Sequence, residues 1–175
     1  MKKLILVLLI GLSLGTAAFA DHEGLGIGIV GGGGWSGTGM GNVGLSLKIP
    51  DLPVFWGIYF PFYYGGSFFG LGITGDYYIF DSNLTSKELT NEDGMYKFRL
   101  DWYLGVGGFF SFRAWKGGGD FDFGIRVPVG LSWHIIRQLE MFLGLYPGLG
   151  IHLGNDYWWP VYPIIGLEIG LRLWL

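Results

Sequence analysis

Residues 97–107 read Lys97-Phe98-Arg99-Leu100-Asp101-Trp102-Tyr103-Leu104-Gly105-Val106-Gly107. Apolar side chains occupy every second position of this stretch, and charged residues, tyrosine or glycine stand between them. Because successive side chains of a strand point to opposite faces, a period of two over this length predicts a β-strand with one apolar face.

The same alternation recurs along the chain and predicts eight strands. Their approximate ranges are 25–32, 42–49, 54–63, 69–77, 97–107, 121–134, 140–153 and 165–175. Most links between them are short, namely 33–41, 50–53, 64–66, 116–120, 136–138 and 154–160, whereas 81–94 is long and polar. Short links join consecutive strands as hairpins, so the pattern predicts an antiparallel up-and-down meander.

The two faces of these strands differ sharply in composition. One face is almost entirely Leu, Ile, Val, Phe and Trp, and the other is mostly Gly with a few charges. Eight strands enclose only enough room for side chains, and a continuous apolar exterior suits lipid. We therefore predict an all-β fold, an eight-stranded antiparallel up-and-down transmembrane β-barrel. The alternative is a soluble, lipocalin-like barrel with its apolar face inward.

The overall composition agrees with a barrel in lipid. Of 175 residues 34 are Gly, 50% are hydrophobic and 14% are charged. After Ala20 no continuous apolar run approaches the roughly 20 residues that a spanning helix needs. A closed barrel is the other structure that satisfies its own backbone hydrogen bonds in a bilayer.

The first residues have the pattern of a secretory signal. Met1-Lys2-Lys3 is followed by an apolar run over 4–14 and by Ala18-Phe19-Ala20. We predict a cleavable signal peptide over 1–20 and a barrel over 21–175, exported to the bacterial outer membrane. An uncleaved anchor is the alternative, but the apolar run is too short to span. The chain has no cysteine, so no disulfide stabilises it.

The charges are few and predominantly acidic. Without Lys2 and Lys3, nine basic residues face fourteen acidic ones, and no basic patch appears, which argues against nucleic acid as a partner. Buried charges must be paired, so we expect the charges on the Gly-rich face to form a network in a packed polar lumen. The residues of this expected network are Lys48, Asp76, Lys97, Arg99, Asp101, Asp122, Arg126, Glu140, Glu168 and Arg172.

Aromatic residues gather near the expected strand ends. Indole and phenol rings favour the headgroup layer of a bilayer, where one side is apolar and the other is wet. The expected interface aromatics are Trp133, Trp158, Trp159 and Trp174. The pair in the last loop could instead bind a ligand or a host surface.

Several motifs resemble a family of small outer-membrane proteins of spirochaetes. They are Gly124-Ile125-Arg126-Val127-Pro128-Val129-Gly130-Leu131-Ser132-Trp133, then 139–143, 147–150 and the ending 166–175. That family is similar to the OmpA, OmpX and OmpW type of eight-stranded barrel. The resemblance covers the chain from about Trp102 onward and implies outer-membrane lipid and the barrel assembly machinery as partners. It carries no catalytic residues, and the chain departs from the usual aromatic terminus by ending on Leu175.

The resemblance also implies an orientation. Both termini of such barrels face the periplasm. The links 33–41, 64–66, 116–120 and 154–160 then face outward, and the long segment 81–94 falls on the periplasmic side, where turns are usually short. Either this barrel departs from that rule, or the strand count is off by one at this segment.

The candidates for chemistry are weak. Ser132, His134 and Glu140 form a nominal acyl-transfer set, as in lipid A acyl-modifying enzymes, but no motif surrounds them and they would face the periplasm. His134 and His152 lack further His or Cys partners at ligand spacing, so no metal or cofactor is expected. The first hypothesis is therefore a non-enzymatic barrel with a structural or surface-interaction role. A narrow OmpW-like channel for small or hydrophobic solutes is the alternative, and a lipid A acyl-modifying enzyme is the third.

Overall fold

The computed structural model describes residues 24–35, 41–62, 68–85, 99–136, 138–154 and 160–175. Its strands are β1 (Gly26–Trp35), β2 (Gly41–Lys48), β3 (Phe55–Phe62), β4 (Phe69–Asn83), β5 (Arg99–Trp115), β6 (Gly118–Arg126), β7 (Val129–Ile136), β8 (Leu139–Leu153) and β9 (Val161–Trp174). Within these residues, no helix is long and apolar enough to cross a bilayer.

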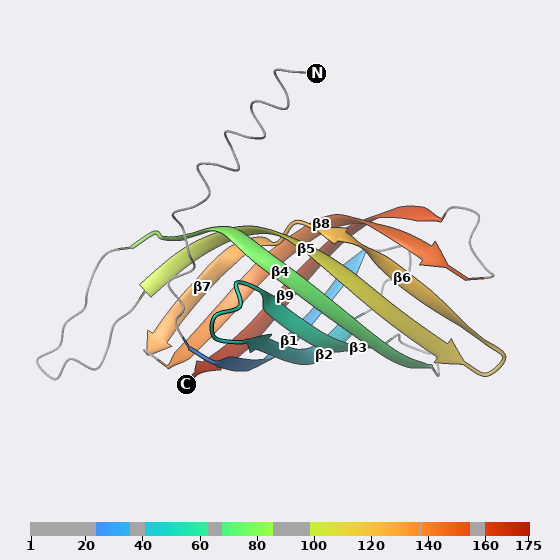
Figure 1. Cartoon of the computed structure of the whole chain (residues 1–175), viewed down its shortest axis with the longest axis horizontal. Coiled ribbons are helices and arrows are strands. Elements are labelled where there is room, and N and C mark those ends of the chain that lie inside the picture. The colour runs from blue at the N-terminus through green and yellow to red at the C-terminus, as the bar shows by residue number, and fades with distance from the viewer. Residues whose placement is uncertain (1–23, 36–40, 63–67, 86–98, 137, 155–159) are drawn as a thin grey trace, which may run out of the picture.

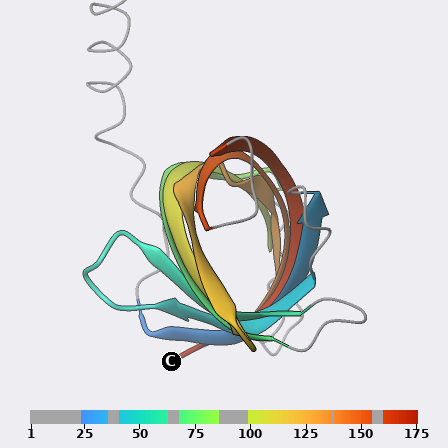
Figure 2. The same cartoon turned by 90° about the vertical axis from the view of Figure 1, so that its right-hand side faces the viewer.

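The strands form one closed antiparallel sheet. Apart from β6 and β7, strands that follow one another along the chain pair as neighbours, and β1 pairs with β9 to close the ring (Figures 1 and 2). Strands β6 and β7 both lie between β5 and β8, because Val127 and Pro128 only interrupt one long strand. The backbone carbonyl of Pro128 still accepts from Gly105 N, at 2.8 Å. The barrel thus has eight strands, and the predicted fold class is confirmed.

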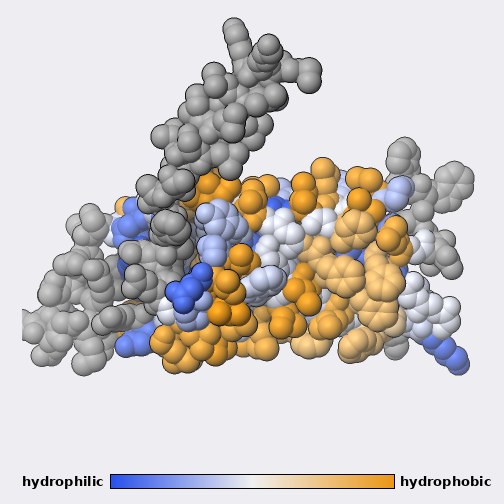
Figure 3. Space-filling model, in the orientation of Figure 1, coloured by the Kyte–Doolittle hydropathy of each residue, from blue (hydrophilic) through white to orange (hydrophobic). Residues whose placement is uncertain are grey.

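The apolar face of the sheet points outward. Ile29, Ile125 and Ile169 expose 59%, 65% and 54% of their surfaces, whereas Asp101 and Arg172 on the inner face expose 0% and 2%. Apolar side chains accordingly cover much of the barrel wall (Figure 3). The soluble alternative, which required the apolar face inside, is wrong.

The height of this apolar wall suits a bilayer. Outward apolar side chains follow one another along β9 from Val161 to Leu173. At about 3.3 Å per residue and a tilt of about 40°, that stretch rises roughly 30 Å, close to the thickness of a hydrocarbon core.

Glycine on the inner face makes room for rings on the adjacent strand. A Cβ at Gly150 would lie 2.6 Å from Tyr162 Cζ, and one at Gly130 would lie 2.6 Å from Tyr103 Cζ. A Cβ at Gly166 would lie only 2.0 Å from both Cε2 and Cζ of Tyr146. Much of the glycine on this face therefore serves to fit large aromatic rings into a narrow barrel.

Several strand boundaries differ from the sequence expectation. Strand β4 continues to Asn83 rather than ending at 77, because a β-bulge between Tyr78 and Phe80 interrupts the alternation there. The start of the expected 81–94 link is therefore strand. Strand β5 likewise continues to Trp115, and a two-residue turn, Lys116–Gly117, replaces the expected link 116–120. Gly117 takes a φ of 99°, which a residue with a Cβ rarely adopts.

The two ends of the barrel can be distinguished. At the terminal end, Leu25 and Leu175 exchange two backbone hydrogen bonds, and the turn after Ile49 joins β2 to β3. The opposite end carries the Lys116–Gly117 turn. Strand β4 ends and β5 begins at the terminal end, so the link between them leaves from there, as the parity of eight strands requires.

Candidate functional site in the barrel lumen

Most ion pairs inside the barrel form three layers along its axis, and a further pair, Arg99–Asp101, lies outside these layers. Strand β9 passes through all of them, with Tyr162 nearest the opposite end, then Glu168, then Arg172 nearest the terminal end. We name them the outer layer (Arg113, Asp120, Asp122), the central layer (Asp76, Arg126, Glu168) and the terminal layer (Lys48, Glu140, Arg172).

In the outer layer one guanidinium group binds two carboxylates. Arg113 donates from Nε to Asp120 Oδ1 and from Nη2 to Asp122 Oδ2, both at 2.7 Å. His152 Nδ1 lies 2.8 Å from Asp122 Oδ1, and the Tyr162 hydroxyl donates to the same oxygen at 2.9 Å. All five side chains come from strands β5, β6, β8 and β9, whose inner faces meet here.

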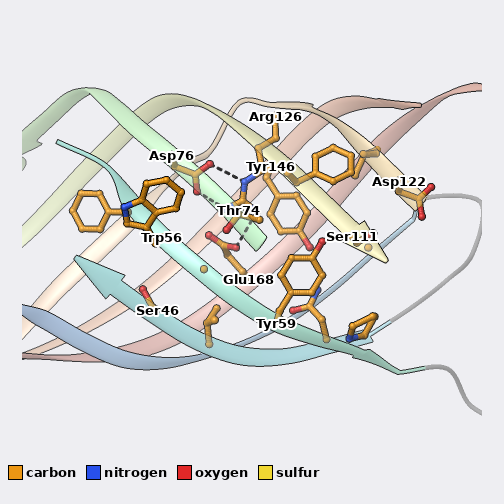
Figure 4. Close-up of a pocket in the computed structure, with 18 of the residues that line it drawn as sticks. Ser46, Trp56, Tyr59, Thr74, Asp76, Ser111, Asp122, Arg126, Tyr146 and Glu168 are labelled. Carbon is orange, nitrogen blue, oxygen red and sulfur yellow. Dashed lines mark hydrogen bonds and ion pairs between the residues drawn. The ribbon is translucent and has the colours of Figure 1, made fainter. Parts of the chain in front are cut away.

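The central layer joins distant strands. Arg126 of β6 donates through Nε to Asp76 Oδ1 of β4 at 2.8 Å and also binds Asp76 Oδ2 through Nη2. Its Nη1 lies 3.5 Å from Glu168 Oε2 of β9, a long contact. The guanidinium also stacks over the Tyr146 ring, 5.0 Å from its centroid. Figure 4 shows Asp76 and Glu168 converging on Arg126 beside Tyr146.

In the terminal layer Arg172 is fully enclosed. Its Nη1 donates to Glu140 Oε2 at 2.8 Å and its Nη2 donates to Ser46 Oγ at 2.9 Å. The Trp174 indole donates to the same Glu140 oxygen at 2.8 Å. Lys48 Nζ donates to the carbonyl of the next residue, Ile49, at 3.1 Å.

Aromatic rings close the lumen around the terminal layer. Phe55 stacks on Tyr78 with centroids 4.3 Å apart, and Tyr78 stacks on Tyr103 at 4.5 Å. The Arg172 guanidinium lies 4.7 Å from the centroids of both Phe55 and Phe142. We call Phe55, Tyr78, Tyr103, Phe142 and Arg172 the plug.

A cavity of about 140 Å³ lies between the plug and the outer layer. The plug residues Phe55, Tyr78, Phe142 and Arg172 form its floor. Its walls carry polar groups of the central and outer layers together with apolar groups, including Tyr59, Thr74, Ser111, Tyr146, Ile164 and Glu168 (Figure 4). The lumen is therefore packed near the terminal end and hollow above it.

The structure places nine residues of the expected network on the inner face of the barrel. The inner face carries Lys48, Asp76, Arg99, Asp101, Asp122, Arg126, Glu140, Glu168 and Arg172. Arg99 Nε donates to Asp101 Oδ1 at 2.8 Å beside the plug. Lys97 lies outside the described residues.

Sequence reasoning missed Arg113, Asp120 and the role of His152. Asp120 stands in the expected link 116–120, and Arg113 lies in the stretch 108–115, which is assigned to neither a strand nor a link. The alternation after Val106 nevertheless continues, with Phe110, Phe112 and Ala114 facing outward. Following that parity past the glycine pair at 107–108 would have placed Arg113 in the lumen.

The expected interface aromatics that the structure describes differ in the face of the sheet on which they lie. Trp133 lies on the outer face of β7. Trp174 does not lie at a lipid interface, because the parity of β9 turns its ring inward onto Arg172, 5.6 Å from the guanidinium carbon. Trp158 and Trp159 lie outside the described residues, as does the segment 1–23 that holds the expected signal peptide.

The nominal acyl-transfer set is not assembled as a catalytic group. Glu140 is held by Arg172 and Trp174, and His134 Nδ1 lies 3.6 Å from the buried carboxylate of Asp101. Within the part of the chain that the structure describes, no group of three or more His, Cys, Asp or Glu residues is arranged to hold a metal ion.

Comparison with known proteins gives matches in structure. No protein-family model and no curated protein sequence matches the chain. The N-terminal β-barrel domain of Pseudomonas aeruginosa OprF is 10% identical, with a TM-score of 0.43 over 85% of this chain and 97% of that one. Neisserial surface protein A (NspA) is 12% identical, with a TM-score of 0.44 over 86% and 96%. A major outer membrane protein from Thermus thermophilus is 12% identical, with a TM-score of 0.32 over 86% and 99%.

The fold itself is that of an outer-membrane barrel. The sheet is closed, the outer face is apolar and the inner face carries the charges, which is the arrangement typical of such barrels. The resemblance predicted from the motifs is thus confirmed for the fold, and the spirochaete affiliation stays a prediction.

Proposed function

We propose that the chain is an integral outer-membrane barrel with a structural or surface-interaction role and a lumen that does not conduct. The plug carries this proposal. Three stacked rings and a caged Arg172–Glu140 pair occupy the interior near the terminal end, and Tyr103 exposes 2% of its surface. Displacing Arg172 or Glu140 alone would leave the other charge buried without its partner, which is costly and opposes opening of the plug.

The biogenesis that goes with this role is also a proposal. A signal peptide over 1–20 would be cleaved on export, and the assembly machinery would recognise β9, whose outer face is an unbroken apolar row ending at Leu173. Outer-membrane lipid then covers the wall. A host or extracellular ligand at the loops of the opposite end is part of the same hypothesis, with its identity open.

Conductance across a planar bilayer tests the closed lumen. The wild-type barrel is expected to give no stable channel steps, whereas Tyr78→Ala, which removes the middle ring of the plug, is expected to give them. Tyr77→Ala is the matched control, because Tyr77 is the adjacent tyrosine and points outward, 40% exposed. Stable channel steps from the wild type would contradict the proposal.

A narrow channel for small or hydrophobic solutes is the second candidate. The cavity of about 140 Å³ favours it, since part of the lumen beside the plug is already hollow. The same recording decides between the two. We propose no enzymatic activity, because the Glu140 carboxylate is engaged by Arg172 and Trp174.

A further inference from the structure

Within each ion-pair layer, the numbers of positively and negatively charged side chains differ. The outer layer sets one guanidinium against two carboxylates, and so does the central layer. The terminal layer sets Lys48 and Arg172 against Glu140. The formal charges of the Asp, Glu, Arg and Lys side chains therefore sum to −1 in the outer layer, −1 in the central layer and +1 in the terminal layer.

This charge pattern coincides with the cavity. The cavity extends from Arg113 and Asp122 in the outer layer, past Asp76 and Glu168, to Arg172 in the plug. Its walls are negative toward the opposite end and its floor is positive. A small cation that enters from the opposite end is attracted by both layers and stopped by the floor.

Glu168 is the carboxylate best placed to hold such a cation. Its contact with Arg126 is 3.5 Å long, whereas Asp76 receives two donors from the same guanidinium. The Glu168 side chain exposes 15% of its surface and that of Asp76 exposes 5%. A carboxylate has about four acceptor sites, so Glu168 keeps capacity for a donor in the cavity.

The lining around Glu168 narrows the chemistry of the ligand. The hydroxyl groups of Thr74, Ser111 and Tyr59 line the same cavity as Glu168, and Ile164 adds an apolar side chain to its wall. A cavity of about 150 Å³ is large enough for benzene, so the space here suits a ligand of about four to six heavy atoms. A primary ammonium group with a short alkyl tail matches both the oxygen acceptors and the apolar wall.

We propose that the lumen cavity is a binding site for a small primary-ammonium ion, held at the Glu168 carboxylate and reached from the end of the barrel opposite the termini. An inorganic divalent cation fits less well, since among the described residues no three His, Cys, Asp or Glu side chains are arranged as metal ligands. The site is distinct from any role of the outer surface or loops, and it does not require conduction.

The test uses the full-length mature barrel, folded in detergent micelles and titrated with propylammonium at constant ionic strength and neutral pH. Binding is followed through the NMR signals of lumen residues. The neutral probe is 1-propanol, which has the same number of heavy atoms, and the anionic probe is propionate. Saturable binding of propylammonium, with weak or absent binding of the other two, is the expected result.

Two variants locate the site. Glu168→Gln keeps the shape and removes the charge, so the dissociation constant should rise at least about tenfold, as expected for loss of a charged hydrogen-bond partner. Ile164→Phe fills the cavity and leaves every charge in place, so it should abolish binding by volume alone. Heat-modifiable migration on gels shows whether each variant is folded.

Asp51→Asn is the matched control for loss of one carboxylate. Asp51 lies in the exposed turn at the terminal end, outside the lumen, with a φ of 63° that asparagine also tolerates. Its affinity for propylammonium should equal that of the wild type. The proposal would be overturned if 1-propanol bound as tightly as propylammonium, or if Glu168→Gln left binding unchanged in a folded barrel. It would also be overturned if calcium, and no ammonium compound, displaced bound propylammonium, or if no saturable binding appeared at millimolar propylammonium.

Discussion

At the scale of single residues, glycine and aromatic rings act as pairs across neighbouring strands. Tyr146 on β8 lies directly opposite Gly166 on β9, and its ring covers the position where a Cβ would stand. The ring fits there because Gly166 has no side chain, and the Arg126 guanidinium stacks over it. Such pairs allow a narrow barrel to contain large tyrosines without distorting its strands.

Gly166→Ala should destabilise the barrel by about 1–3 kcal/mol, because the added methyl must displace a ring in a packed lumen. Gly31→Ala is the control. Its Cβ would meet its nearest neighbour, the backbone oxygen of Asn42, at 3.8 Å, so the change should stay within about 0.5 kcal/mol. Urea titration of the folded and unfolded forms in detergent measures both. Equal losses would show that the ring contact does not matter.

At the scale of elements, β4 and β5 are the longest pair in the barrel and contain its clearest irregularity. Tyr78 pairs with Gly105 and Phe80 pairs with Leu104, so Ile79 is an extra residue in β4. The bulge returns Phe80 to the outer face and leaves the rest of β4 in register with β5. Beyond this bulge the side chains of β4 no longer follow the period of two set by the first part of the strand, so the sequence pattern does not predict the rest of it.

Deletion of Ile79 should be tolerated, because the residues before and after it would keep their present partners on β5 when the extra residue is removed. The free energy of unfolding should change by no more than about 2 kcal/mol. Deletion of Ile73 in the same strand is the control, since it shifts one part of β4 by one residue and turns its side chains to the wrong faces. Heat-modifiable migration should persist in the first variant and disappear in the second. Loss of folding in the first would contradict the bulge assignment.

At the scale of the whole molecule, the barrel is an inverted globule, with apolar groups outside and charges inside. That inversion is stable only where lipid covers the wall, since the outward Ile, Leu and Phe side chains would otherwise face water. The balance of charge inside is also a property of the whole barrel, because each layer combines residues from strands far apart in sequence.

A charge on the outer wall should cost most at mid-height. Leu167 lies near the middle of the outward row of β9 and Leu173 lies at its terminal end. Leu167→Lys should destabilise the barrel in lipid vesicles by about 2–4 kcal/mol, and Leu173→Lys by about 0–1 kcal/mol. Urea titration of vesicle-inserted protein measures the difference. Equal effects would contradict the proposed position in the bilayer.

Single cysteines test the orientation, since the chain has none of its own. Lys116→Cys lies in the turn at the opposite end and Asp51→Cys in the turn at the terminal end. A membrane-impermeant thiol reagent added to intact cells should label the first and spare the second. Labelling of the second alone would reverse the proposed topology.

The sequence by itself determined the class of the fold. A period of two in residues 97–107 and in seven further segments specified strands, and the contrast between the apolar and Gly-rich faces specified which side meets lipid. Both signals are local, because each strand carries its own alternation. For the same reason the charges on the Gly-rich face could be named without knowing their partners.

Only the tertiary structure decided which charges meet and where space remains. The pairing of Arg126 with Asp76 joins residues 50 positions apart, and that of Arg172 with Glu140 joins residues 32 apart. Such partners depend on strand stagger around the closed ring, which local periodicity does not contain. The bulge at Ile79 is visible only in the pairing of β4 with β5, whereas the inward turn of Trp174 follows the parity of β9 that the local alternation already contains. The cavity beside Glu168 follows from the closure of the barrel, because a ring of fixed size decides how much of the lumen the side chains fill.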